Sequence, residues 1–110
     1  MASNQTIRTF SYIIEDSEYV PALSIKTLKE PGKFLYSVTL SAMIKDESRQ
    51  IARIDNYHDG RTHHIHHIRD NDEKQLPVEV SNFREASQYM IDNWNRMVME
   101  YLKWMEREKV

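Results

Sequence analysis

The sequence predicts an α+β fold: an antiparallel meander of four to five strands with one long C-terminal helix packed on one face of the sheet. Two patterns carry this prediction. Residues 33–44 alternate apolar and polar side chains, as expected for a strand with one buried face. Residues 81–106 repeat apolar side chains at the spacing of a helix with one buried face.

The length and the composition of the chain predict one domain without disulfide cross-links. The chain has 110 residues and no cysteine, so an ordinary core is expected and disulfides, cysteine-ligated zinc and thiol catalysis are excluded. The first residues lack the basic and apolar regions of a signal peptide, and no apolar run approaches the ~20 residues of a membrane span. We therefore expect a single cytoplasmic domain over residues 1–110, with no membrane contact and no cofactor.

The expected strands follow one another through short turns. Residues 6–14 and 19–28 are two strands separated by a polar turn, and Pro31-Gly32 turns the chain into the strand of residues 33–44. Residues 45–49 lead into a histidine-rich hairpin, which brings the strand region to residue 69. Residues 70–73 are expected as an acidic loop, and residues 76–80 as a short edge segment because Pro77 cannot donate to a ladder.

The predicted helix has an unusually broad apolar stripe. Ser81 is placed to cap it. The stripe exceeds the ~100° that a surface helix needs, and consists of Phe83, Ala86, Met90, Ile91, Trp94, Met97, Val98, Tyr101, Leu102, Trp104 and Met105. This breadth fits deep contact with the sheet, and it also leaves open a homodimer formed through the helix.

All five histidines lie within residues 58–67, around an Asp59-Gly60 pair that is typical of a two-residue hairpin turn. That turn sets Asp55 opposite His64, Ile54 opposite Ile65, Arg53 opposite His66 and Ile51 opposite Ile68. Side chains alternate between faces of a strand. One face of the hairpin therefore collects Arg53, Asp55, Tyr57, His64 and His66, and the other collects Ala52, Ile54, Asn56, His58, His63, Ile65 and His67.

The first of these faces has the groups needed for acid–base chemistry on a phosphodiester. Histidine exchanges a proton near neutral pH, so His64 and His66 are the predicted acid–base pair, with Asp55 and Tyr57 positioning them. Arg53 would bind a phosphate, with Asn56 and Arg61 as further substrate contacts. Residues 49–69 contain four arginines and two aspartates, although the whole chain has a net charge of −2. A locally basic ribbon is compatible with an anionic ligand such as RNA.

Three other interpretations of the hairpin remain open. His64, His66 and Asp55 resemble a ligand set for iron or zinc, although Arg53 would repel a cation. The hairpin could instead bind nucleic acid or protein without chemistry, which leads to a non-catalytic, homo-oligomeric interaction protein as the alternative function. For His58, His63 and His67, which share a face with Ile54 and Ile65, a structural role with satisfied hydrogen bonds is preferred.

The arrangement resembles the small TumE-like proteins of prokaryotic toxin–antitoxin pairs, or a related uncharacterised prokaryotic family. Arg53, Asp55 and Asn56 match an Arg-x-Asp-Asn element, and the paired histidines His63, His64, His66 and His67 match the element that follows it. The order of elements agrees over roughly residues 34–105. The resemblance implies a cytoplasmic toxin that is neutralised by a DNA-binding antitoxin partner, with ribonuclease activity as its toxic mechanism.

Overall fold

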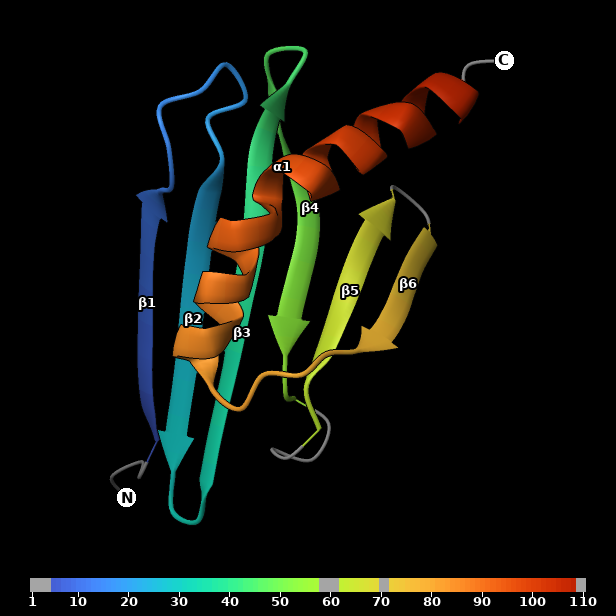
Figure 1. Cartoon of the computed structure of the whole chain (residues 1–110). Coiled ribbons are helices and arrows are strands. Elements are labelled where there is room, and N and C mark those ends of the chain that lie inside the picture. Colours follow the sequence, from blue (N-terminus) through green and yellow to red (C-terminus); the bar gives the residue numbers. More distant parts are fainter. Residues whose placement is uncertain (1–4, 58–61, 70–71, 109–110) are drawn as a thin grey trace.

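The chain folds into one six-stranded antiparallel sheet crossed on one face by a single helix (Figure 1). The computed structural model describes residues 5–57, 62–69 and 72–108. Its strands follow the order of the sequence across the sheet: β1 (Thr6–Ile13), β2 (Ala22–Glu30), β3 (Lys33–Ile44), β4 (Glu47–Asp55), β5 (His64–Arg69) and β6 (Asp72–Pro77). Helix α1 (Phe83–Glu108) packs against β2, β3 and β4. The predicted α+β meander with one C-terminal helix is confirmed.

Strand β3 has the bounds and the alternation that the sequence predicts. Tyr36, Val38 and Leu40 are at most 1% exposed on the helix side, whereas Ser37, Thr39 and Ser41 point to the other face and are half-buried. The turn into β3 is also the predicted one. Glu30 pairs with Lys33, and Gly32 adopts a positive φ of 74° that a side chain would disfavour.

An irregularity between β3 and β4 adds apolar volume to the core. The pairing changes between Leu40 and Ser41, so that Ala52 pairs with Leu40, Gln50 pairs with Ser41, and Ile51 becomes the extra residue of a bulge. Both Ile51 and Ala52 are 0% exposed. The bulge therefore turns two consecutive side chains of β4 into the core, and the ordinary alternation returns at Arg53.

The sheet has more strands than the four to five expected. The additional strand is β6, which begins at Asp72, inside the segment predicted to be an acidic loop, and ends at Pro77. Its six residues pair with the whole of β5. A proline is tolerated there because β6 is the edge of the sheet. The short edge segment expected over residues 76–80 is wrong, since the strand lies earlier in the chain.

Two other boundaries differ from the sequence predictions. The segment expected to turn over residues 45–49 is a two-residue turn, in which Lys45 and Asp46 both have positive φ, so β4 starts at Glu47. Strand β2 starts at Ala22 and not at residue 19, because Pro21 comes directly before it and Val20 has a φ of 41°.

The cap of α1 lies one residue after the predicted Ser81. The Asn82 side chain accepts a hydrogen bond from the Glu85 backbone amide at 2.9 Å, which makes Asn82 the N-cap. Ser81 instead donates from its backbone amide and its hydroxyl to the Glu85 carboxylate, at 3.1 and 3.0 Å. Ser81 and Asn82 therefore both form hydrogen bonds with Glu85 in the first turn, and the helix begins at Phe83.

The apolar stripe of α1 is used mainly by the protein's own sheet. Met90 and Val98 are fully buried, and Trp94, Met97 and Tyr101 are at most 7% exposed. Residues further round the stripe, including Ile91, Leu102 and Met105, are half-buried against the same core. Self-packing thus accounts for the centre of the broad stripe, and a homodimer through the helix stays a prediction.

Candidate functional site

Three of the four pairs predicted for the histidine hairpin are confirmed, while Ile51 and Ile68 lie beyond the last pair of the β4–β5 ladder. Asp55 pairs with His64, Ile54 with Ile65, and Arg53 with His66. The apolar pair faces α1, because Ile54 and Ile65 are 0% and 3% exposed. Arg53, Asp55, His64 and His66 consequently share the opposite face of the sheet, which lies behind the ribbon in Figure 1 and carries no helix. We call these four residues and Tyr57 the β4–β5 cluster.

The carboxylate of Asp55 is the centre of the β4–β5 cluster. Its Oδ2 atom accepts a hydrogen bond from Arg53 Nε at 2.9 Å and lies 3.3 Å from His66 Nε2. Its Oδ1 atom lies 3.5 Å from the backbone amide of Tyr57. Asp55 is only 3% exposed although no helix covers this face. A carboxylate so far removed from water is tolerated because a cation and hydrogen-bond donors surround it.

The two histidines of the β4–β5 cluster occupy different depths. His66 is 6% exposed and lies against Asp55, on the diagonal of the pairing, whereas the expected partner of Asp55 was the directly opposed His64. His64 is half-buried and closer to solvent. The Asp55 carboxylate contacts the deeper imidazole, that of His66, and His64 is the more accessible imidazole on this face.

Tyr57 extends the β4–β5 cluster beyond the end of β4. Its side chain is 41% exposed, and its hydroxyl donates to Ser37 Oγ at 3.4 Å. Ser37 pairs with Asp55 across β3 and β4, and Thr39 pairs with Arg53 in the same way. Hydroxyl groups therefore continue the polar surface from the cluster across β3, and Tyr57 offers an accessible aromatic ring beside it.

Asn56, predicted to contact substrate, holds the strands together instead. Its Oδ1 accepts a hydrogen bond from the Tyr36 backbone amide at 2.9 Å, and its Nδ2 donates to the Phe34 carbonyl at 3.1 Å. Asn56 is 4% exposed. Its amide therefore continues the β3–β4 ladder by one step beyond the last paired residue, which explains an asparagine at this position.

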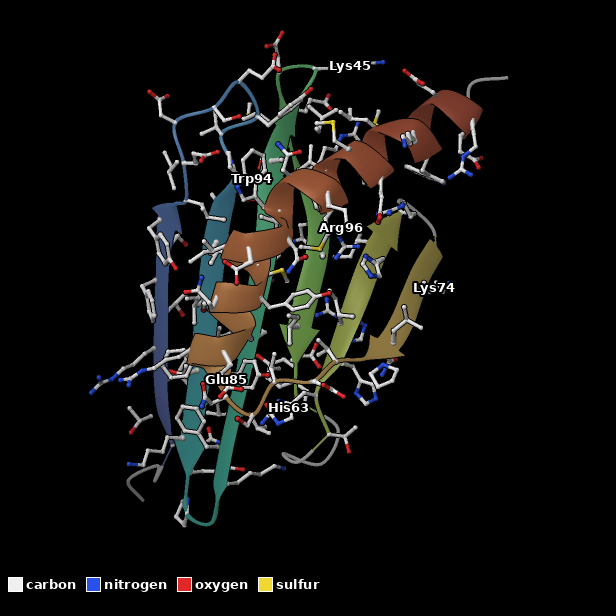
Figure 2. The ribbon with its side chains drawn as sticks, in the orientation of Figure 1. Lys45, His63, Lys74, Glu85, Trp94 and Arg96 are labelled. Atoms are coloured by element: carbon white, nitrogen blue, oxygen red, sulfur yellow. The ribbon has the colours of Figure 1, made fainter. Side chains whose placement is uncertain are left out.

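His63 has the structural role preferred for its face of the hairpin. Its Nδ1 lies 2.7 Å from the hydroxyl of Tyr36, a residue that is 1% exposed. Burial, together with the charges of Asp55 and Glu85, raises the pKa of the Tyr36 phenol well above its ordinary value. The phenol accordingly keeps its proton at neutral pH, and its hydroxyl forms a hydrogen bond with His63 Nδ1. Figure 2 places His63 beneath the start of α1, near Glu85.

Some predicted features fall outside the described residues. These are the Asp59-Gly60 turn, His58 and the substrate-binding candidate Arg61. Within the part of the chain that is described, no group of three or more histidine, aspartate or glutamate side chains is arranged to hold a metal ion. Among the same residues, no helix is both long and apolar enough to cross a membrane.

Comparison with known proteins places the chain in a family. The family model DUF7718, described as a domain of unknown function, matches residues 2–107. The chain belongs to the DUF7718 family. No curated protein and no solved structure matches it. The match covers both the sheet and the helix, so the whole fold described above is that of a DUF7718 domain.

Replacing Asn56 by alanine tests its role in this DUF7718 domain. The variant loses both hydrogen bonds to β3, and the buried amide of Tyr36 and the part-buried carbonyl of Phe34 lose this partner. We expect a loss of about 2–4 kcal/mol in the free energy of unfolding, measured in urea. Asn95→Ala, at an exposed position of α1, is the matched control, and we expect it to change stability by less than ~0.5 kcal/mol. Equal effects of the two substitutions would contradict the assignment.

Proposed function

We propose that the β4–β5 cluster binds an RNA phosphodiester and cleaves it without a metal ion, as a toxin-like ribonuclease. The observation that supports this most is the Asp55 carboxylate, which is buried on a face without a helix and contacts both Arg53 and His66. A buried charge network is costly to maintain. A purely solvent-facing side of a sheet does not need one, whereas a site that must hold ligand-binding groups in place does.

Arg53 is the proposed phosphate-binding group. Its side chain is 31% exposed, and Nε donates to Asp55, which orients the guanidinium on the surface of the sheet. A planar guanidinium can donate two parallel hydrogen bonds to phosphate oxygens. It also balances the charge that develops on these oxygens during the reaction. Thr39, opposite Arg53 on β3, lies on the same side of the sheet.

His64 and Tyr57 are the proposed proton-transfer groups. His64 pairs with Asp55 at the end of the β4–β5 ladder, and Tyr57 follows Asp55 by two residues, so the phosphate is placed between these two side chains. His64 takes the proton of the ribose 2′-hydroxyl, whose oxygen then bonds to phosphorus. The bond from phosphorus to the 5′ oxygen breaks, and that oxygen receives a proton from Tyr57. The imidazolium of His64 returns its proton to Tyr57, leaving a 2′,3′-cyclic phosphate.

His66 is assigned a positioning role, which changes the acid–base pair expected from the sequence. Its ring is 6% exposed and lies 3.3 Å from Asp55, so it acts on substrate through the carboxylate. The exposed ring of Tyr57 adds a surface on which a base can stack, a contact typical of single-stranded RNA recognition. RNA is therefore favoured as substrate over a small phosphodiester.

RNA cleavage is tested with the purified full chain and a labelled single-stranded RNA in the presence of EDTA. We expect a cyclic phosphate product, and no cleavage of the matching DNA, which lacks the 2′-hydroxyl. His64→Ala should slow cleavage by about 10²–10⁴-fold, the usual contribution of a general base.

His67→Ala is the matched control, because His67 lies on the same strand but faces α1. It should leave the rate nearly unchanged. Equal rates for the unmodified chain and His64→Ala would attribute any cleavage to a contaminant and contradict the proposal.

The toxin role is tested by synthesis of the chain in cells that have no antitoxin partner for it. If the cluster cleaves cellular RNA, induced synthesis of the unmodified chain should arrest growth, whereas synthesis of His64→Ala at the same level should not. Circular dichroism and urea unfolding of the purified variant verify that it is folded. Cells without a second, protective gene could instead grow normally while they make the unmodified chain at high level. This result would overturn the toxin role, even where cleavage is seen in vitro.

A further inference from the structure

A basic cavity of about 420 Å³ lies on the helix side of the sheet, where β5 and β6 meet the second half of α1. It is separate from the β4–β5 cluster, which occupies the other face. Four basic side chains from three elements line it together with one carboxylate, one indole and one leucine: His67, Arg69, Lys74, Arg96, Glu100, Trp104 and Leu76. Figure 2 shows Lys74 on the outermost strand β6 and Arg96 on the helix.

Arg69 is held in this cavity by aromatic rings. Its guanidinium carbon lies 5.3 Å from the centre of the Tyr101 ring and 5.9 Å from that of Trp104. Its Nη1 atom donates to the Ile68 carbonyl at 3.0 Å. Cation–π contacts with two rings hold a guanidinium in place without neutralising its charge. The arginine is therefore positioned as a group that binds an anion would be.

The positive charge of the cavity exceeds its negative charge. Arg96 contacts Glu100 at 3.4 Å and Asn93 at 3.2 Å. Arg69, Lys74 and Arg96 carry three permanent positive charges, and Glu100 is the one acidic residue among those that line the cavity. Lys74 is exposed, and within the described residues neither its side chain nor that of His67 forms a hydrogen bond or ion pair.

The pKa of His67 is affected by these charges, which shows that they lie close to its ring. Burial lowers the pKa of its imidazole, and Arg69, Arg96 and Lys74 lower it further, while Glu100 alone opposes them. Three cations from three elements thus act on one half-buried ring. An anion bound among them would reverse the sign of the local potential and raise the pKa of His67.

We infer that this cavity binds a phosphorylated small molecule. Its volume lies within the ~300–1,000 Å³ usual for small-molecule sites. Arg69 and Arg96 supply donors for phosphate oxygens and Lys74 adds a flexible positive charge at the entrance. The indole of Trp104 provides an apolar wall for the remainder of the ligand. The inference does not depend on RNA cleavage at the β4–β5 cluster.

Titration calorimetry of the full chain with ADP and with inorganic pyrophosphate tests this inference. Both should bind at a single site, and Lys74→Ala should weaken binding about tenfold, the effect of losing one charge-assisted contact. Lys33→Ala, which replaces an exposed lysine at the start of β3, is the control and should bind as the unmodified chain does. Tighter binding of ADP than of pyrophosphate would show that the indole wall contributes.

NMR titration of the His67 ring provides a second readout that does not depend on a variant folding. Saturating ADP should raise the pKa of His67 and leave the ring signals of His63, which precedes β5 and contacts the Tyr36 hydroxyl, unchanged. Absence of binding heat together with an unaltered His67 titration would overturn the inference. Equal weakening of ligand binding by Lys74→Ala and Lys33→Ala would also overturn the inference, because the effect would then follow from net charge alone.

Discussion

The organisation of the helix-free face depends on one buried negative charge. Asp55 is 3% exposed, yet its carboxylate lies at the end of β4, on the face of the sheet that carries no helix in the described part of the chain. Water is excluded by the side chains that contact the carboxylate, chiefly Arg53 and His66. These three residues consequently depend on one another. The carboxylate orients the guanidinium and contacts the deeper imidazole, and the positive charge and hydrogen bond of the guanidinium in turn make its burial tolerable.

The other side of the sheet gives this face its rigidity. Tyr36, Val38, Leu40, Ile54 and Ile65 form the layer beneath α1, and each is at most 3% exposed. Because side chains alternate along a strand, burial of Ile54 and Ile65 necessarily turns Arg53, Asp55, His64 and His66 to the opposite surface. A slip of one residue would exchange the two sets. The apolar core therefore sets the register, and the register assembles the polar cluster.

Local patterns were sufficient to predict much of this arrangement. The alternation of β3 fixes its bounds, and the spacing of the hairpin fixes the pairs Asp55–His64 and Arg53–His66. The choice between His64 and His66 as the partner of Asp55 could not be predicted, because side-chain rotamers and burial decide it. Strand β6 was missed because its mixed charges and Pro77 do not alternate like a strand that covers a core. The basic cavity was missed for another reason: His67, Lys74 and Arg96 meet only when α1 crosses the sheet.

A double-mutant cycle on Arg53 and Asp55 tests the central claim most directly. Urea unfolding is measured for the unmodified chain, Arg53→Gln, Asp55→Asn and the double variant, at low and high salt. If the buried carboxylate and the guanidinium support one another, each single substitution is strongly destabilising, and the double variant loses less than the sum by at least ~1 kcal/mol. Additive losses within ~0.3–0.5 kcal/mol would show that the two groups are energetically independent, and the account of this face would be wrong.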